Sequence, residues 1–241
     1  EICGQVIEKV LEEDTTISIF VKQGMHNKYL IDSACDVLLD CVCDYGKLSR
    51  AGTFRQKASE VSFGLDDSID RFAIETPSGR QILLRGVIDR VDIAEIDGQK
   101  AAVVYDYKRR ETSVSWQKMY HGLDTQLGVY MLAVEQIEID GSKPDFAAGA
   151  FYLPIESPAN AKPDRFARKA RGVANGDYYE HLDNNAESGW NEYYNFYIGK
   201  KSPYSHYANN ALLRPAEFQA LLGFVKQRIG EIADGILDGD T

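Results

Sequence analysis

Hydrophobic residues recur at helical spacing near the start of the chain. Residues 5–21 carry apolar side chains at positions 6, 7, 10 and 11 and then a β-branched run, which predicts a helix followed by an extended or second helical piece. A further helix is predicted over residues 28–45. Its apolar positions are Ile31, Ala34, Cys35, Leu38, Leu39 and Val42. Because Cys35, Cys41 and Cys43 fall in this segment, we expect thiols packed as small hydrophobic groups rather than a metal or cluster site.

From residue 57 the pattern changes to alternation with a period of two. Four extended segments are predicted, over residues 59–63, 71–76, 81–96 and 101–108. Turn-forming residues separate them, and Asp97-Gly98 between the last two is one of the strongest short signals for a β-hairpin.

The remainder of the chain predicts a helix over 116–136, a strand over 146–153 and a last helix from Pro215 to just before Gly239. Helices, a strand meander and a further helix and strand indicate one α/β or α+β domain. We divide it into a helical lead-in (1–56), a core that carries the candidate chemistry (57–153), an irregular segment rich in aromatic and basic residues (154–210) and a C-terminal helix (211–240).

Composition narrows the class of protein. A chain of 241 residues with 44% hydrophobic and 27% charged side chains is neither a disordered tail nor a mini-protein, and its apolar runs are too short to span a membrane. Four cysteines are too few for a disulfide scaffold, which suggests an intracellular, cytoplasmic protein. The chain starts at Glu1 rather than Met, so we expect a fragment of a longer protein. A net charge of −10 argues against a nucleic-acid partner unless basic residues gather locally.

The hairpin at Asp97-Gly98 places two carboxylates together. With a two-residue turn, opposed positions sum to 195, so Asp89 faces Asp106, and Lys108 lies on the same face. A four-residue loop would preserve that shared face, whereas a three-residue loop would separate the residues. Opposed carboxylates repel each other, and a divalent cation such as Mg²⁺ would compensate them. The alternative is a surface ion-pair ladder in which Asp89 joins Arg90 and Lys108.

Three ordered motifs resemble a known family. They are Gly86-Val87-Ile88-Asp89, Asp106-Tyr107-Lys108, and Gln126 with Tyr130 four residues later. This pattern is similar to the Gly-x-x-Asp, Asp-x-Lys and Gln-x-x-x-Tyr motifs of the RecB-like branch of the PD-(D/E)XK nucleases, and within it to the C-terminal nuclease domains of the AddB family, the B subunits of bacterial ATP-dependent helicase-nucleases. The likeness covers most of 57–153 and 212–240. It implies a restriction-endonuclease-like fold, a mixed β-sheet flanked by helices.

The resemblance also assigns roles to residues. It implies that Asp89 and Asp106 bind Mg²⁺ or Mn²⁺, that the Tyr107 carbonyl is a third ligand, and that Lys108 is the catalytic lysine. The implied activity is metal-dependent cleavage of DNA phosphodiester bonds by an exonuclease, in a helicase-nuclease that processes double-strand break ends for recombinational repair. DNA and a partner subunit of the helicase-nuclease are the implied partners.

Further substrate-binding residues are expected beside the metal site. The resemblance implies that Gln126 and Tyr130 bind substrate, and their spacing of one helical turn makes them point the same way; the alternative is a half-buried polar edge of a packed helix. Arg109 and Arg110 follow the catalytic motif and would give it a locally positive rim despite the negative total charge. Basic and aromatic residues are also interleaved between 162 and 207, where they either contact DNA or cap the core. We expect Glu60 to be structural.

Two departures from the family pattern affect the expected activity. The family has a histidine in an upstream Gly-x-x-x-His, which His26 does not match, and we expect that histidine to lie before Glu1. Related AddB domains bind an iron-sulfur cluster, but none of the four cysteines matches its ligands, so a cluster is expected only in the full-length protein. We therefore expect weak metal binding and poor cleavage from this chain alone. The alternative is a catalytically silent scaffold that binds DNA or a partner subunit.

Overall fold

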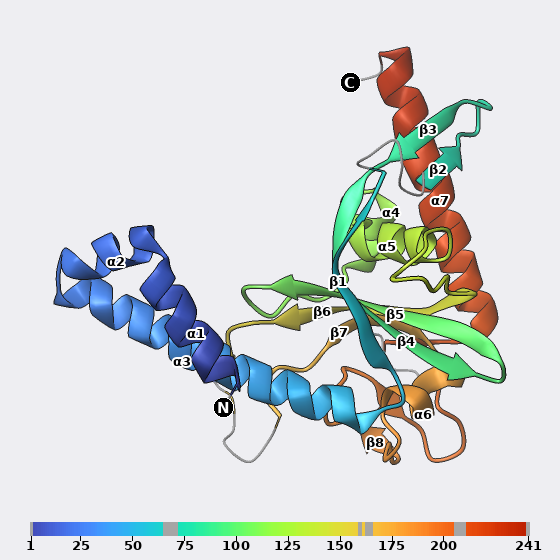
Figure 1. Cartoon of the computed structure of the whole chain (residues 1–241). Helices are drawn as coiled ribbons and strands as arrows, with labels where there is room; N and C mark the ends of the chain where they lie inside the picture. Colours follow the sequence, from blue (N-terminus) through green and yellow to red (C-terminus); the bar gives the residue numbers. More distant parts are fainter. Residues whose placement is uncertain (1, 65–71, 159–160, 162–165, 205–210, 240–241) are drawn as a thin grey trace.

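The computed structural model describes residues 2–64, 72–158, 161, 166–204 and 211–239. A six-stranded sheet with helices on both faces forms the body of the protein, and three N-terminal helices extend away from it (Figure 1). This arrangement confirms the predicted mixed sheet flanked by helices. Among the helices of the described residues, none is both long and apolar enough to cross a membrane.

The N-terminal helices form an arm beside the sheet. They are α1 (Ile2–Glu13), α2 (Thr15–Lys22) and α3 (Met25–Ala51). Asp14 starts α2, where its side chain accepts hydrogen bonds from two backbone amides, so the second helical piece is confirmed. Only the C-terminal half of α3 has buried residues, among them Cys41 and Tyr45. The expectation of packed thiols is therefore confirmed for Cys41 and wrong for the exposed Cys43.

The main sheet has the order β1-β4-β5-β6-β7-β10. Its strands are β1 (Arg55–Phe63), β4 (Gly86–Ile96), β5 (Gln99–Lys108), β6 (Phe146–Pro154), β7 (Arg171–Asn175) and β10 (Leu212–Leu213). The β5–β6 and β7–β10 pairs are parallel and the others are antiparallel. The sheet is therefore mixed.

The predicted hairpin register is confirmed. Ile96 pairs with Gln99 and Arg90 pairs with Tyr105, so opposed positions sum to 195. Asp97 and Gly98 form the turn, with φ values of 51° and 77°. The single strand predicted over 81–96 is wrong, because it is interrupted at residue 85. Its first part, β3 (Gln81–Leu84), pairs with β2 (Phe72–Glu75) in a separate two-stranded sheet.

The helix predicted over 116–136 is also divided in two. Helix α4 (Trp116–Tyr120) and helix α5 (Gln126–Val134) are separated by a turn in which Gly122 has φ 75°. A Cβ at this glycine would lie 2.4 Å from the Ile232 side chain of α7 (Pro215–Asp238), so the turn also allows α7 to approach closely. Helix α7 starts at Pro215 and ends just before Gly239, as predicted, and Gly239 lies in the left-handed region (φ 81°).

The segment 154–210 is less irregular than expected. It contributes β7 to the main sheet, together with the short elements η1 (Gly176–Tyr178), α6 (Tyr179–Leu182), β8 (Gly189–Trp190) and β9 (Tyr197–Ile198). Tyr194 and Phe196 are buried in the core on one face of the sheet, with the end of α3. Helices α5 and α7 cover the opposite face, on which the candidate site lies.

Candidate active site

Four polar side chains meet between the end of β5 and the start of α5. Lys108 Nζ lies 2.5 Å from Asp106 Oδ2 and donates a hydrogen bond to Gln126 Oε1 at 3.0 Å. Gln126 Nε2 donates to Asp106 Oδ1 at 2.8 Å and to the Tyr130 hydroxyl at 2.9 Å. All the polar atoms of the Gln126 amide are therefore used, and they join the strand motif to the helix motif.

Asp89 joins this group from β4. Its Oδ2 accepts a hydrogen bond from the backbone amide of Tyr107 at 2.7 Å, which ties the carboxylate to the strand between Asp106 and Lys108. Burial raises the pKa of Asp106, Lys108 acts in the opposite direction, and the charge of Asp89 raises the pKa a little further. The two carboxylates are thus close enough to interact, as the hairpin register predicts.

The alternative ion-pair ladder along the hairpin is wrong. Arg90 lies on the other face of the sheet, where its guanidinium binds both oxygens of Asp92 at 2.6 Å. Lys108 is paired with Asp106 instead. Neither cation is therefore available to form the ladder with Asp89.

Tyr152 and Asp124 support the site and were not identified from the sequence. Tyr152 of β6 pairs with Asp106 across the sheet, and its ring lies 5.3 Å from Lys108 Nζ. Its hydroxyl donates to Asp124 Oδ1 at 3.0 Å, and Asp124 Oδ2 accepts from the backbone amide of Ser115. Burial raises the pKa of the Tyr152 hydroxyl, and the adjacent Asp124 raises it further. The strand predicted over 146–153 contains this tyrosine, but only the parallel pairing of β5 with β6 places Tyr152 beside Lys108.

The donor set fits one divalent cation with few protein ligands. Asp106 Oδ2 is buried and has no hydrogen bond of acceptable geometry, although Lys108 Nζ is nearby, so it is an oxygen that a cation can use. Hard cations such as Mg²⁺ prefer carboxylate and carbonyl oxygens and retain several waters. Within the described part of the chain, no group of three or more His, Cys, Asp and Glu side chains is arranged to hold a metal. The fit therefore rests on two carboxylates and backbone oxygen.

The basic rim is partly neutralised. Arg109 and Arg110 both form ion pairs with Glu156, at 2.7 and 3.4 Å, and their side chains are 78% exposed. They lie at the end of β5 next to Lys108, as expected, but share one carboxylate. A phosphate would have to compete with Glu156 for them.

The other sequence candidates lie outside this network. Glu60 is an exposed residue of β1 with φ 53°. His26 is exposed in the first turn of α3. All four cysteines are free thiols. The Tyr107 ring lies on the opposite side of β5, 5.8 Å from the Tyr45 ring.

Most of the described aromatic and basic residues between 162 and 207 serve the fold. Arg168 is buried and binds Asp44 at 2.8 Å, and the Lys169 ammonium donates to the Asn191 carbonyl. Tyr194 is buried as well. Arg165 lies outside the described residues. Trp190 is an exception, because half of its surface is exposed.

Comparisons with known proteins show which proteins this chain is similar to. The chain is 29% identical over 237 residues to the B subunit of an ATP-dependent helicase/deoxyribonuclease from Natranaerobius thermophilus, covering 92% of this chain and 19% of that protein. Proteins of the same name from Clostridium tetani (24% identical, 100% of this chain, 22% of that protein) and Symbiobacterium thermophilum (37% identical, 52% and 12%) also match. The chain thus spans about a fifth of the length of the relatives that it matches over most of its own length.

The family model that matches describes the PD-(D/E)XK nuclease superfamily, and the match runs from residue 3 to residue 240. It includes both strands of the hairpin, α5 and α7. On this evidence the chain belongs to the PD-(D/E)XK nuclease superfamily.

Proposed function

We propose that this chain is a metal-dependent DNA nuclease domain that hydrolyses phosphodiester bonds as an exonuclease. The observation that carries the proposal is the network of Asp106, Lys108 and Gln126, with Asp89 held next to it. A lysine between a buried carboxylate and an amide, with a second carboxylate tied to the same strand, suits both cation binding and charge stabilisation at phosphate. The names of the relatives support a deoxyribonuclease.

The roles divide as follows. Asp89 and Asp106, with the Tyr107 carbonyl, would hold Mg²⁺ or Mn²⁺. When bound, such a cation polarises a phosphoryl oxygen and lowers the pKa of bound water. Lys108 donates a hydrogen bond to the attacking water or to a non-bridging phosphate oxygen, and Gln126 holds both Lys108 and Asp106 in position.

Residues around the centre bind the substrate. Tyr130 has its hydroxyl bonded to Gln126, and its pKa is raised, first by burial, so it stays a neutral hydrogen-bonding group beside the phosphate. Arg109 and Arg110 contact neighbouring phosphates of the DNA strand, which compete with Glu156 for the two guanidinium groups.

The relatives support a biological setting for this nuclease. In this proposal the chain acts in the cytoplasm as part of a bacterial helicase-nuclease, with a partner subunit, and trims double-strand break ends for recombinational repair. The names of the relatives, which combine helicase and deoxyribonuclease, support that setting. An iron-sulfur cluster would belong to the full-length protein only.

A catalytically silent scaffold is the second candidate. It is favoured by the ion pair of Lys108 with Asp106, because this contact already compensates one carboxylate without a metal. It is also favoured by the lack of a third His, Cys, Asp or Glu ligand among the described residues. A scaffold with this site would bind DNA or a partner subunit and release no nucleotides.

A single-turnover assay separates the two candidates. With the chain in excess over labelled single-stranded or duplex DNA, we expect slow cleavage that requires Mg²⁺ or Mn²⁺ and stops with EDTA. Asp106→Asn should lower the rate at least about 100-fold, which corresponds to about 2.7 kcal/mol of the barrier. The control is Glu95→Gln, which neutralises an exposed carboxylate of the same hairpin opposite Lys100. No cleavage and no heat of metal binding by calorimetry would support the scaffold.

A further inference from the structure

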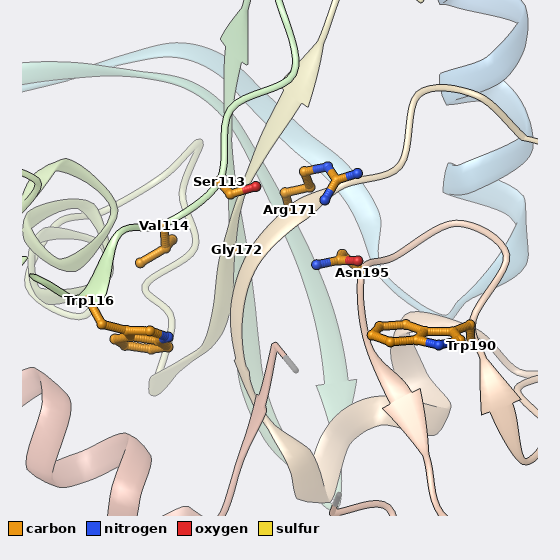
Figure 2. A pocket seen from close by; sticks show the side chains of 7 residues that line it. All are labelled: Ser113, Val114, Trp116, Arg171, Gly172, Trp190 and Asn195. Carbon is orange, nitrogen blue, oxygen red and sulfur yellow. The ribbon is translucent and has the colours of Figure 1, made fainter. Parts of the chain in front are cut away.

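A hollow of about 240 Å³ lies at the edge of the sheet, next to the candidate active site. Its lining residues are Ser113, Val114, Trp116, Arg171, Gly172, Trp190 and Asn195. Figure 2 shows the two tryptophans on opposite sides of the hollow, with β7 at Gly172 between them and Arg171 and Ser113 along one edge. The site described above includes none of these residues.

The sheet register places this hollow in line with the cleavage centre. Asp106 pairs with Tyr152, and Tyr152 pairs with Arg171, so these three residues form one row across β5, β6 and β7. Directly paired residues share a face, and neighbouring strands lie about 4.8 Å apart, so the Arg171 and Asp106 backbones are about 10 Å apart. At about 3.4 Å of rise per nucleotide, that is about three stacked nucleotides.

The two tryptophans are exposed although they are the largest apolar side chains. Trp116 is 41% exposed and Trp190 is 50% exposed. Both are held in place. Trp116 is the first residue of α4, and the preceding Ser115 caps this helix while its backbone amide donates a hydrogen bond to Asp124. The Trp190 ring packs edge-on against the Tyr197 ring, with 5.6 Å between the ring centroids. Ordered aromatic faces beside a phosphodiester-cleaving centre are suited to stacking on bases.

Arg171 provides the positive charge of the hollow. Its Nη2 pairs with Glu111 at 2.9 Å, and both side chains keep contact with solvent, at 23% and 41% exposed. An ion pair of this kind is weak enough to be exchanged for a phosphate. Gly172 lines the hollow without a side chain, and a Cβ there would meet the Ala150 carbonyl oxygen of β6 at 1.9 Å, so β7 can pair this closely with β6 only with glycine at this position.

We propose that this hollow binds single-stranded DNA about three nucleotides from the bond that is cleaved, with a base stacked on Trp116 or Trp190 and a phosphate on Arg171. The inference rests on the function proposed above and adds a strand-selective subsite to it. A base in a duplex has both faces covered by its neighbours and its edge paired, so only an unpaired strand can turn a base into the hollow.

The composition of the chain provides a direct probe. Trp116 and Trp190 are its only tryptophans, so intrinsic tryptophan emission reports on this hollow alone. We expect single-stranded oligothymidylate, added in EDTA to prevent cleavage, to quench that emission, and a hairpin duplex of equal nucleotide number to quench it much less. The variants Trp116→Phe and Trp190→Phe assign the quenching to each side and, as aromatic replacements, should retain most of the affinity.

Binding measured by fluorescence anisotropy of a labelled oligothymidylate gives the magnitude. At least one of the variants Trp116→Ala and Trp190→Ala should raise Kd about 5- to 150-fold, the range expected for loss of one base–aromatic stack. Arg171→Gln should reduce the slope of log K against log salt by about 0.7, because one phosphate contact is lost. Tyr29→Ala, which removes an aromatic side chain 66% exposed on α3, is the matched control and should change nothing. Thermal melts confirm that each variant folds.

The outcomes separate this inference from the proposed function. Equal quenching by duplex, or an unchanged Kd in both Trp→Ala variants, would overturn the subsite even if Mg²⁺-dependent cleavage is seen. Quenching by oligothymidylate with loss of affinity in the alanine variants would support the subsite even if no DNA is cleaved. Equal weakening by Tyr29→Ala would show that the effect is not local and would also overturn it.

Discussion

Removal of Asp92 should destabilise the fold strongly, because it leaves a buried guanidinium without its partner. The Arg90 and Asp92 side chains are 5% and 1% exposed, and two hydrogen bonds of 2.6 Å join them. Arg90 also donates to the Ser49 hydroxyl at 2.6 Å, so the pair connects β4 with the end of α3. Although burial acts to lower it, the bonds with Asp92 raise the pKa of Arg90, and the guanidinium stays charged.

The magnitude follows from this burial. Breaking a buried ion pair by removing one partner costs about 3–5 kcal/mol, so Asp92→Ala should lower the free energy of unfolding by that amount. For a chain of this size, 1 kcal/mol corresponds to about 2–4 °C, so Tm should fall by about 6–20 °C. Replacing both partners, as Arg90→Met with Asp92→Leu, should recover most of the loss, because no charge then remains buried.

Urea unfolding followed by circular dichroism measures these differences. Glu13→Ala is the matched control, because it breaks the ion pair of Lys9 and Glu13, whose side chains are 69% and 68% exposed, and should change stability by less than about 1 kcal/mol. A cost below about 1 kcal/mol for Asp92→Ala would refute the reasoning. So would a double variant less stable than Asp92→Ala alone.

Three further predictions concern the site and its supporting helices. Gln126→Ala removes a hydrogen bond to the charged carboxylate of β5, worth about 1.5–3 kcal/mol, and should lower single-turnover cleavage about 10- to 150-fold; a change in KM alone would contradict this. Gly128→Ala brings a Cβ within 2.8 Å of the Val225 methyl groups of α7 and should cost about 1–3 kcal/mol in a thermal melt, whereas an unchanged Tm would show that α7 moves freely. The hydrogen bond from the Ser78 hydroxyl is the main cause that lowers the pKa of Asp234. The Asp234 carboxylate therefore stabilises the fold at pH values above its unfolded pKa of about 3.9, and this stabilisation is lost as the pH falls through the folded pKa. Unfolding curves at several pH values should therefore show Asp234→Asn less stable than the parent at pH 7 and equal to it in strong acid; a difference independent of pH would contradict the assignment.

Local features of the site could be predicted well from sequence. The turn at Asp97-Gly98 fixes the register of β4 and β5, and the position of Asp89 beside the Asp106 strand follows from counting residues. Gln126 and Tyr130 lie one turn apart on any helix, and the structure joins them by a hydrogen bond. These relations involve near neighbours or a single tight turn, so secondary-structure geometry alone determines them.

Element boundaries were less predictable where long-range packing decides them. The apolar pattern over 116–136 continues through Gly122, yet the helix breaks there, and the close approach of Ile232 from α7 accompanies the break. Strand β7 lies in a segment without clear alternation of apolar and polar residues. Its pairing with β6 on one edge and β10 on the other, rather than its own sequence pattern, makes it a strand.

The sequence by itself determined the candidate chemistry: two carboxylates and a lysine on one hairpin face, and an amide and a hydroxyl on one helix. Only the tertiary structure decided what surrounds them. Parallel pairing of β5 with β6 brings Tyr152 next to Lys108. Glu156 forms ion pairs with Arg109 and Arg110, and residues 116 and 190 line the same hollow. Each of these contacts joins segments that are distant in sequence, and their meeting depends on the packing of the whole sheet and its helices, which no local pattern encodes.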